Sequence, residues 1–425
     1  MKILFLCGGI GKRMFPITED KFLLKFLGKT LLEHQIGLAK KVGLAEFITV
    51  ANPRNISKIE HIVSGTSGIK VESAIQKEPL GIADALKCAE YLLDDDIIVV
   101  NPNDVFDSSV YLQLIEARKA GTAISYLPGY EVRDYFPGGY LAVDSSKGML
   151  KLIAEKPEPG KEPSNLVNIL VHLHTAPKRL LEYIEAVQTS RGDIYECAID
   201  AMVKDNCTIK VVPYNGSWTP IKYPWHIFHV VRQLLDQSPK YISPSAHISE
   251  KAVIEGKVII EDNVRVFENA VIRGPAYIGP DSVIGNNSLV RDYSHIGANC
   301  VVGYSTEVKG SYVGDGCWFH MSYIGDAIIG ERCSFGAGTI LSNFRFDEKN
   351  ISVIIEGKPV DSGLNKFSAI IGNNSKIGVN VSVLPGVKIG PNSIIGPHVC
   401  LTKDLEPDRM ALPERGYITI RNKIR

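Results

Sequence analysis

An apolar residue returns at every sixth position between residues 242 and 308. These residues are Ile242, Ile248, Ile254, Ile260, Val266, Ile272, Ile278, Ile284, Val290, Ile296, Val302 and Val308. A small residue usually stands two positions before each of them, and a Gly often follows. A period of six fits neither an amphipathic helix nor an alternating strand. It is typical of a solenoid in which each short strand points one residue inward, with three strands to a turn.

The repeat shifts its register near Gly314 and continues beyond it. The later positions are Tyr323, Ile329, Phe335 and Leu341, and then Ile371, Ile377, Val383, Ile389, Ile395 and Leu401. A solenoid with one long interruption therefore spans roughly 242–405. The pattern resembles the hexapeptide-repeat family, which implies a left-handed parallel β-helix. The same resemblance implies a homotrimer with active sites between its subunits.

The first 230 residues alternate strand-like and helix-like stretches instead. Apolar runs at 3–7, 47–51, 97–101 and 123–127 predict strands, and apolar residues at helical spacing between Ile82 and Leu93 predict a crossover helix. The sequence therefore predicts a Rossmann-like α/β domain at 1–235. A linker around 236–240, a solenoid domain at 240–405 and a tail at 406–425 complete the predicted organisation.

Composition narrows the partners that we expect. The chain has 425 residues, of which 47 are basic and 47 acidic, so no nucleic-acid partner is expected. We find no long apolar run and no signal peptide, and we expect a cytoplasmic protein without a membrane partner. The eight cysteines include no CxxC pair, which favours reduced residues over a zinc or disulfide framework.

A glycine-rich segment follows the first predicted strand, at residues 6–13. Gly8, Gly9 and Gly11 allow backbone N–H groups to close around a polyphosphate, and Arg13 adds a positive charge. A turn without a ligand and a dinucleotide-binding loop are the alternatives at this point.

The residues that follow resemble the sugar-1-phosphate nucleotidyltransferase family, which opens with LxxGxGTRxxPxT and a later Lys. The further matches are Gln76 to Gly81 for base recognition, Asn103-Asp104-Val105-Phe106 for the metal-binding turn, Glu155-Lys156-Pro157 for the sugar and Asn168 for a sugar contact. The resemblance covers about residues 1–232.

This resemblance implies that a sugar-1-phosphate attacks a nucleoside triphosphate and releases pyrophosphate. Arg13 and Lys21 would then neutralise the triphosphate, and Asp104 would hold Mg²⁺. Gln76 and the Gly81 backbone would read the base. The expected sugar ligands are Gly139, Glu155, Lys156 and Asn168. A strand-end cap for Asp104 and a solvated charge for Lys156 are the structural alternatives.

The chain departs from the family pattern where a second metal ligand is usual. The family follows a late Trp with W-x-D-I-G, but here the sequence reads Trp218-Thr219-Pro220-Ile221-Lys222. A proline side chain cannot bind a metal. Lys12, Asp20 and Leu170 also replace common residues. We therefore expect nucleotidyl transfer that is impaired or uses metals differently.

A second motif lies in the solenoid, at His320-Met321-Ser322-Tyr323-Ile324-Gly325-Asp326-Ala327, followed by residues 336–340 and Asn343. It resembles the acetyltransferase half of the bifunctional glucosamine-1-phosphate acetyltransferase/N-acetylglucosamine-1-phosphate uridylyltransferase family. An imidazole can take the proton of an amine at neutral pH, so His320 is the candidate base.

The resemblance implies the other ligands of this site. Tyr323 and Asn343 would position the amino sugar, and the Ala337 amide would meet acetyl-CoA. The interruption at 342–368 carries Lys349, Lys358 and Lys366, which we expect to bind the acetyl-CoA co-substrate. A disordered surface excursion is the alternative. The stretch Arg345-Phe346-Asp347-Glu348-Lys349 resembles one in archaeal-type bifunctional enzymes.

The sequence therefore predicts a trimeric bifunctional enzyme that makes a UDP-N-acetylhexosamine from a hexosamine-1-phosphate, acetyl-CoA and a nucleoside triphosphate. It leaves open UTP against dTTP and glucosamine against galactosamine. An acetyltransferase with a degenerate first domain and a non-catalytic scaffold are the rival functions.

Overall fold

The computed structural model describes residues 1–144, 146–189 and 192–414. These residues form two compact units. Unit 1 contains Met1–Ile10 and Leu31–Pro220, whereas unit 2 contains Gly11–Thr30 and the chain from Ile221 onward. Within the described ranges, no helix is long and apolar enough to cross a membrane.

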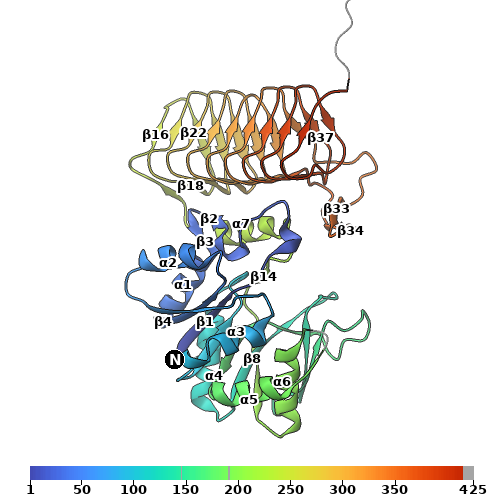
Figure 1. The fold of residues 1–425 in the computed structure, drawn as a ribbon. Helices are drawn as coiled ribbons and strands as arrows, with labels where there is room; N and C mark the ends of the chain where they lie inside the picture. Colours follow the sequence, from blue (N-terminus) through green and yellow to red (C-terminus); the bar gives the residue numbers. More distant parts are fainter. Residues whose placement is uncertain (145, 190–191, 415–425) are drawn as a thin grey trace, which may run out of the picture. The chain divides into compact units, whose positions relative to one another are not determined.

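Unit 1 is a Rossmann-like α/β unit around a ten-stranded sheet of order β11-β9-β10-β13-β8-β12-β6-β1-β4-β5 (Figure 1). Its strands are β1 (Lys2–Cys7), β4 (Glu46–Ala51), β5 (Lys70–Ile75), β6 (Ile97–Val100), β8 (Ser125–Glu131), β9 (Gly139–Asp144), β10 (Met149–Glu155), β11 (Leu166–Asn168), β12 (Val171–His174) and β13 (Ile209–Tyr214). Strand β1 is parallel to β4 and β6, whereas β12 is antiparallel to β6 and β8. A separate small sheet pairs β7 (Asp104–Phe106) with β14 (Trp218–Pro220).

The helices of unit 1 are α1 (Leu31–Lys41), α2 (Ile56–Ser64), α3 (Ile82–Cys88), α4 (Ser109–Ala120), α5 (Pro177–Ala186) and α6 (Ile194–Lys204). Three of them, α3, α5 and α6, share one apolar core with the sheet. Leu86 of α3, Leu181 of α5 and Ile199 of α6 share this core with Val99 of β6. The predicted strands are confirmed as β1, β4, β6 and β8. The apolar pattern misses β5, because most of its residues are only partly buried.

The predicted crossover helix is shorter than its apolar pattern. Helix α3 ends at Cys88, and a 3-10 turn, η3 (Glu90–Leu92), follows. This turn keeps Leu92 and Leu93 buried, so the apolar positions continue although the α-helix does not.

Unit 2 contains the predicted left-handed parallel β-helix. Its three sheets each add one strand per turn, and every pairing between these strands is parallel (Figure 1). The first sheet holds β15 (Tyr241–Ile242), β18 (Val258–Ile260), β21 (Ala276–Ile278), β24 (Ser294–Ile296), β27 (Tyr312–Val313), β30 (Ile328–Ile329), β35 (Ile370–Ile371) and β38 (Lys388–Ile389). The second holds β16 (His247–Ile248), β19 (Arg265–Val266), β22 (Val283–Ile284), β25 (Val301–Val302), β28 (Trp318–Phe319), β31 (Ser334–Phe335), β36 (Lys376–Ile377), β39 (Ile394–Ile395) and β41 (Met410–Ala411). The third holds β17 (Val253–Glu255), β20 (Val271–Arg273), β23 (Leu289–Arg291), β26 (Glu307–Lys309), β29 (Tyr323–Gly325), β32 (Ile340–Leu341), β37 (Ser382–Val383) and β40 (Cys400–Leu401).

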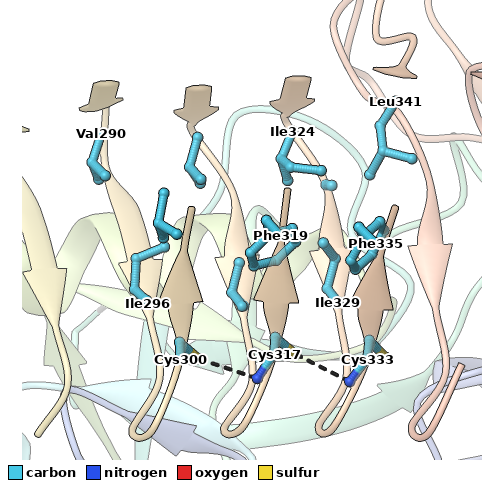
Figure 2. Packing of buried hydrophobic residues seen from close by; sticks show 14 of the residues in the cluster. Val290, Ile296, Cys300, Cys317, Phe319, Ile324, Ile329, Cys333, Phe335 and Leu341 are labelled. Atoms are coloured by element: carbon cyan, nitrogen blue, oxygen red, sulfur yellow. Dashed lines mark hydrogen bonds between the residues drawn. The ribbon is translucent and has the colours of Figure 1, made fainter. Parts of the chain in front are cut away.

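From Ile248 onward the repeat residues form the interior of this β-helix as continuous columns, whereas Ile242 at its first strand is 37% exposed. Phe319 and Phe335 stack with ring centroids 4.7 Å apart, and Cys300, Cys317 and Cys333 follow one another along a neighbouring column (Figure 2). The Cys317 N–H donates to Cys300 Sγ at 3.4 Å, and the Cys333 N–H donates to Cys317 Sγ at the same distance. These three cysteines are free thiols that fill the core, whereas Cys400 is exposed and Cys88, Cys197 and Cys207 are only partly buried.

The register shift near Gly314 comes from three turns that are one residue short. At a regular corner between two strands, one residue has a positive φ, and it stands three positions after the inward residue, as Asn263 does after Ile260. After Val308, Phe319 and Ile324 it stands only two positions later, at Gly310, Met321 and Asp326. The inward position of β29 is consequently Ile324, which is fully buried, and not Tyr323. The assignment of Tyr323 to the repeat is therefore wrong, and its side chain does not belong to the interior column.

The interruption after β32 is an ordered insertion. It contains a hairpin of β33 (Ser352–Ile355) and β34 (Lys358–Asp361). Val353, Ile355 and Phe367 bury their side chains. The alternative of a disordered excursion is therefore wrong.

The described residues of unit 2 contain five further elements. They are two 3-10 turns, η1 (Lys12–Met14) and η2 (Lys21–Leu23), strands β2 (Lys25–Phe26) and β3 (Lys29–Thr30), and helix α7 (His226–Gln237). Asp236 and Gln237, expected in a linker, are the last residues of α7. Strand β41 pairs with β39, so part of the predicted tail belongs to the β-helix, while residues 415–425 lie outside the described residues.

Candidate functional sites

A buried ion pair organises the residues around the solenoid motif. Lys309 Nζ lies 3.0 and 2.8 Å from the two carboxylate oxygens of Asp326, and the two side chains are only 14% and 16% exposed. Asn343 Nδ2 donates to Asp326 Oδ2 at 2.5 Å and to the Tyr323 hydroxyl at 3.2 Å. The structure thus brings Tyr323, Asp326 and Asn343 together, with the Asn343 amide as their shared donor.

His320 lies in the short turn that ends at Tyr323. Its backbone N–H donates to Phe335 O at 3.1 Å, and its side chain is exposed. Ala337 lies in the turn between β31 and β32, where its carbonyl accepts the Asn380 N–H at 2.9 Å. The exposed imidazole is open to a substrate amine, which a general base requires.

The three lysines of the insertion do not form one cluster. Lys366 pairs with Phe344, directly after Asn343. Lys349 is exposed ahead of β33, and Lys358 lies at the hairpin turn opposite Ile355. Of the three, only Lys366 is placed by backbone pairing beside the Asn343 segment.

A stack of three aromatic rings on the β-helix holds the segment Gly11–Thr30 within unit 2. The rings of Tyr277, His295 and Tyr312 stack at centroid distances of 4.9 and 4.8 Å. The Leu27 N–H donates to His295 Nε2 at 3.1 Å, and the Tyr312 hydroxyl donates to Lys25 O at 2.9 Å. Burial lowers the pKa of His295 to about 4, so its neutral ring can accept that bond.

The predicted phosphate residues of this segment lie close to one another. A Cβ at Gly11 would be 3.4 Å from Lys21 Cε, and Lys21 Nζ donates to Ile221 O at 2.9 Å. Arg13 is half exposed, and its Nε lies 3.8 Å from Glu356 Oε2 of the insertion. Both residues line a cavity of about 400 Å³ with Lys12, Phe15 and Lys388.

Gly8, Gln76 and Gly81 come together in unit 1, as the base-recognition motif predicts. A Cβ at Gly8 would overlap Gln76 Oε1 at 2.1 Å, so only glycine fits there. Gln76 Nε2 donates to Gly81 O at 2.9 Å and to Asp84 Oδ2 at 2.8 Å. Gly9 is exposed beside Gly8. The backbone of this loop is accessible because glycines keep side chains away from it.

Gly139, Glu155 and Asn168 also come together, and we call these three residues the Gly139 cluster. Gly139 pairs with Glu155 across β9 and β10, and a Cβ on Gly139 would be 3.1 Å from Glu155 Oε2 and 3.5 Å from Asn168 Cβ. Lys156 Nζ lies 2.6 Å from Glu155 Oε1 and is largely exposed. A carboxylate, an amide and an open glycine surface suit the hydroxyls of a sugar.

Asp104 begins β7, and the register places Pro220 directly opposite it. Asn101 Nδ2 donates to Asp104 Oδ1 at 3.0 Å, and Trp218 Nε1 donates to Asp104 Oδ2 at 3.1 Å. Across the described residues, no group of three or more His, Cys, Asp or Glu side chains could hold a metal ion. These residues do not fit a magnesium site built from two carboxylates.

Several polar residues of these sites escape the sequence reasoning. Lys309 and Asp326 are 17 residues apart, and only the coil geometry makes them an ion pair. Asp326 lies inside the quoted motif, but its spacing does not reveal its partner. Asp84 carries a signal that could be found, since it follows the Gly81 turn in the first turn of α3.

Known proteins resemble the chain along nearly its whole length. Residues 2–218 match the family model for nucleotidyl transferases, and residues 257–292 and 368–403 match the one for bacterial transferase hexapeptide repeats. The bifunctional protein GlmU of Methanococcus maripaludis (strain C7) is 38% identical over 418 residues, which covers 96% of each chain. The bifunctional sugar-1-phosphate nucleotidylyltransferase/acetyltransferase of Sulfurisphaera tokodaii is 33% identical over 410 residues, covering 95% of this chain and 98% of its own.

Among solved structures, a UDP-glucose pyrophosphorylase complexed with UDP-glucose aligns with 56% of this chain and 99% of its own. Its sequence identity is 19% and its TM-score is 0.48, which is too weak a likeness to carry an argument. The two curated relatives, in contrast, cover both units at more than 30% identity. The chain therefore belongs to the family of bifunctional sugar-1-phosphate nucleotidylyltransferases/acetyltransferases.

Proposed function

We propose that the chain is a bifunctional enzyme that acetylates a hexosamine-1-phosphate and joins the product to a nucleotide. The observation that carries this proposal is the cluster of Lys309, Asp326, Asn343 and Tyr323, together with the exposed side chain of His320, which stands three positions before Tyr323 in the chain. Membership of the family supports both activities. UTP or dTTP and glucosamine- or galactosamine-1-phosphate are the proposed substrates.

In the acetyl transfer, His320 accepts the proton that the hexosamine ammonium loses. The amine nitrogen then attacks the thioester carbonyl of acetyl-CoA, the C–S bond breaks, and the second proton that the nitrogen loses leaves with the CoA thiolate as the CoA thiol. Tyr323 and Asn343 orient the amino sugar, because Asp326 fixes the Asn343 amide. Lys309 and Arg291 occupy adjacent positions in neighbouring coils and supply positive charge for the sugar phosphate. We assign acetyl-CoA to the Ala337 turn and to Lys349, Lys358 and Lys366.

In the nucleotidyl transfer, a phosphate oxygen of the sugar-1-phosphate attacks the α-phosphorus of the triphosphate and displaces pyrophosphate. Arg13 and Lys21, with the loop of Gly8, Gly9 and Gly11, stabilise the developing negative charge. Gln76 and the Gly81 backbone contact the base. The Gly139 cluster and Lys156 bind the sugar.

We propose that this second activity is impaired or has altered metal use, since Pro220 stands opposite Asp104. Mg²⁺ in proteins needs one or two carboxylates besides substrate phosphates, so Asp104 is the ligand that this chain would offer. An enzyme with acetyl transfer alone is the second candidate function, and the same pairing favours it.

Substitution of His320 tests the first activity. In the full-length chain, His320→Ala should lower acetyl transfer by roughly 10² to 10⁴ in rate while pyrophosphate release stays unchanged, because a positioned base is lost. His247→Ala serves as the matched control, since His247 is also exposed but belongs to β16. Acetyl transfer within a few-fold of wild type would contradict the role of His320.

Pyrophosphate release tests the second activity. It is measured with UTP and dTTP across Mg²⁺, Mn²⁺ and Co²⁺, with Asp104→Ala as the inactive control. Pro220→Asp should raise the rate with Mg²⁺, because it adds a carboxylate opposite Asp104. Wild-type turnover at ordinary enzyme rates with Mg²⁺ would refute the impairment. No turnover with any metal would leave acetyl transfer as the sole activity.

We also propose that the protein is a homotrimer, because the repeat residues fill only the inside of the β-helix and leave its outer faces for other subunits. We propose the cytoplasm as its location. Trp318, Ile340 and Met410 leave apolar side chains exposed on its strands. Light scattering on the full-length chain should give three times the chain mass of 46.6 kDa. An active monomer would contradict the trimer. The domain limits at 235, 240 and 405 stay a prediction.

A further inference from the structure

A chain of hydrogen bonds runs from Asn168 of the Gly139 cluster into the core of unit 1. His172 Nε2 lies 2.7 Å from Asn168 Oδ1, and His172 Nδ1 lies 2.7 Å from the Tyr195 hydroxyl. The same hydroxyl lies 2.8 Å from His174 Nε2, and His174 Nδ1 lies 2.8 Å from Ser125 Oγ. The four residues behind Asn168 are at most 1% exposed. Water therefore cannot replace a missing partner in this chain.

Both imidazoles are neutral, so each ring has one donor and one acceptor. Burial lowers the pKa of His172 well below its ordinary value and that of His174 to about 3. With the Asn168 carbonyl facing His172, the direction of every bond follows. His172 Nε2–H donates to Asn168, Tyr195 donates to His172 Nδ1, His174 Nε2–H donates to Tyr195, and Ser125 donates to His174 Nδ1.

The opposite direction is also self-consistent, but it turns the Asn168 amide around. It would present the amide oxygen to the site that Glu155 shares. A Cβ at Gly139 would be 3.1 Å from Glu155 Oε2 and 3.8 Å from Asn168 Nδ2, so both side chains border the same space. A carboxylate favours the amide NH₂ there over a second negative oxygen. The neighbourhood of Glu155 therefore selects the first direction.

We propose that Ser125, His174, Tyr195 and His172 are positioning residues that hold Asn168 with its amide nitrogen toward the substrate, where it donates to a hydroxyl of the sugar. This inference rests on the proposed nucleotidyl transfer. A sugar hydroxyl can accept from Asn168 and donate to Glu155 at the same time. The pair thus recognises a hydroxyl rather than a group that only donates or only accepts.

The tautomers test the positioning without any activity. Nitrogen NMR of the full-length chain with ¹⁵N-labelled histidine should show His172 and His174 as neutral Nε2–H tautomers. Tyr195→Phe removes the shared hydroxyl and should change the tautomer of at least one ring. An Nδ1–H tautomer or a charged ring at either position in the wild type would overturn the inference.

Ligand affinity tests the sugar contact. Calorimetry with UDP-N-acetylglucosamine and with UDP separates the sugar from the nucleotide. Tyr195→Phe should weaken the nucleotide sugar roughly 5- to 10-fold and leave UDP unchanged, the effect of losing about one oriented hydrogen bond. His172→Leu should act like Tyr195→Phe, whereas His172→Gln keeps a donor for Asn168 and should restore most of the affinity.

Tyr111→Phe is the matched control, because the Tyr111 hydroxyl is buried in unit 1 and has no hydrogen-bond partner among the residues that the structure describes. Equal effects of Tyr195→Phe and Tyr111→Phe on UDP-N-acetylglucosamine, or equal effects of Tyr195→Phe on both ligands, would overturn the positioning role. If the wild type binds UDP but gains nothing from the sugar, the Asn168 contact is wrong. If it binds neither of these ligands nor their dTDP counterparts, the proposed nucleotidyl transfer itself fails, and the sugar contact fails with it.

Discussion

Glu196 of α6 is a carboxyl group whose ionisation should weaken the folded state of unit 1. Burial, and then the negative charge of Glu155, raise its pKa from an ordinary 4.5 to about 7. The folded protein therefore holds this proton more tightly than the unfolded chain does. Stability contributed by the protonated group is present at acidic pH and is lost as the pH rises from about 4.5 to about 7.

The size of the loss follows from the two pKa values. A tenfold difference in proton affinity corresponds to about 1.4 kcal/mol, so the ionised Glu196 costs on the order of 3 kcal/mol above pH 7. Glu196→Gln keeps the shape of the side chain and cannot ionise. It should stabilise unit 1 by about 3 kcal/mol at pH 8 and by about 1 kcal/mol at pH 5.

Thermal unfolding at both pH values measures this difference. For a unit of about 200 residues, 3 kcal/mol corresponds to a rise in Tm of roughly 6 to 12 °C at pH 8, against about 2 to 4 °C at pH 5. Glu185→Gln on the exposed face of α5 is the control and should leave Tm nearly unchanged at both pH values. A gain for Glu196→Gln that is equal at pH 5 and pH 8 would refute the reasoning, because only ionisation depends on pH.

Two further substitutions test unit 2. Asp326→Asn should lower acetyl transfer by roughly 10²-fold, since it removes the charge that pairs with Lys309 and fixes Asn343. Asp347→Asn, which changes an exposed ion pair, is the control. Similar rates of acetyl transfer for both variants would contradict the role of Asp326. Phe319→Ala should cost about 3 to 5 kcal/mol in denaturant unfolding, because it opens a cavity in the aromatic column, whereas Phe346→Ala on a fully exposed side chain should cost little. A loss below about 1 kcal/mol for Phe319→Ala would show that this column does not stabilise the β-helix.

The sequence by itself determines the two fold classes, because burial in each is a local and periodic property. An apolar residue at every sixth position from Ile242 to Val308 specifies the β-helix without knowledge of any distant contact, and from Ile248 onward these residues point inward. The motifs likewise identify the groups of Gly8 with Gln76 and Gly81, and of Gly139 with Glu155 and Asn168. These groups assemble where the strands that carry the motifs pair in the sheet, as β9 pairs with β10 at Gly139 and Glu155.

The tertiary structure decides the pairings that no period records. Three short turns make Ile324 the inward residue and release Tyr323 to meet Asn343. Coil stacking creates the Lys309–Asp326 ion pair, and the aromatic stack assigns the segment Gly11–Thr30 to unit 2. His172 and His174 look like ordinary strand residues in the sequence. Their neutral, directional hydrogen bonds exist only because β12, β8 and α6 meet in a buried core, where each polar atom needs a partner from elsewhere in the chain.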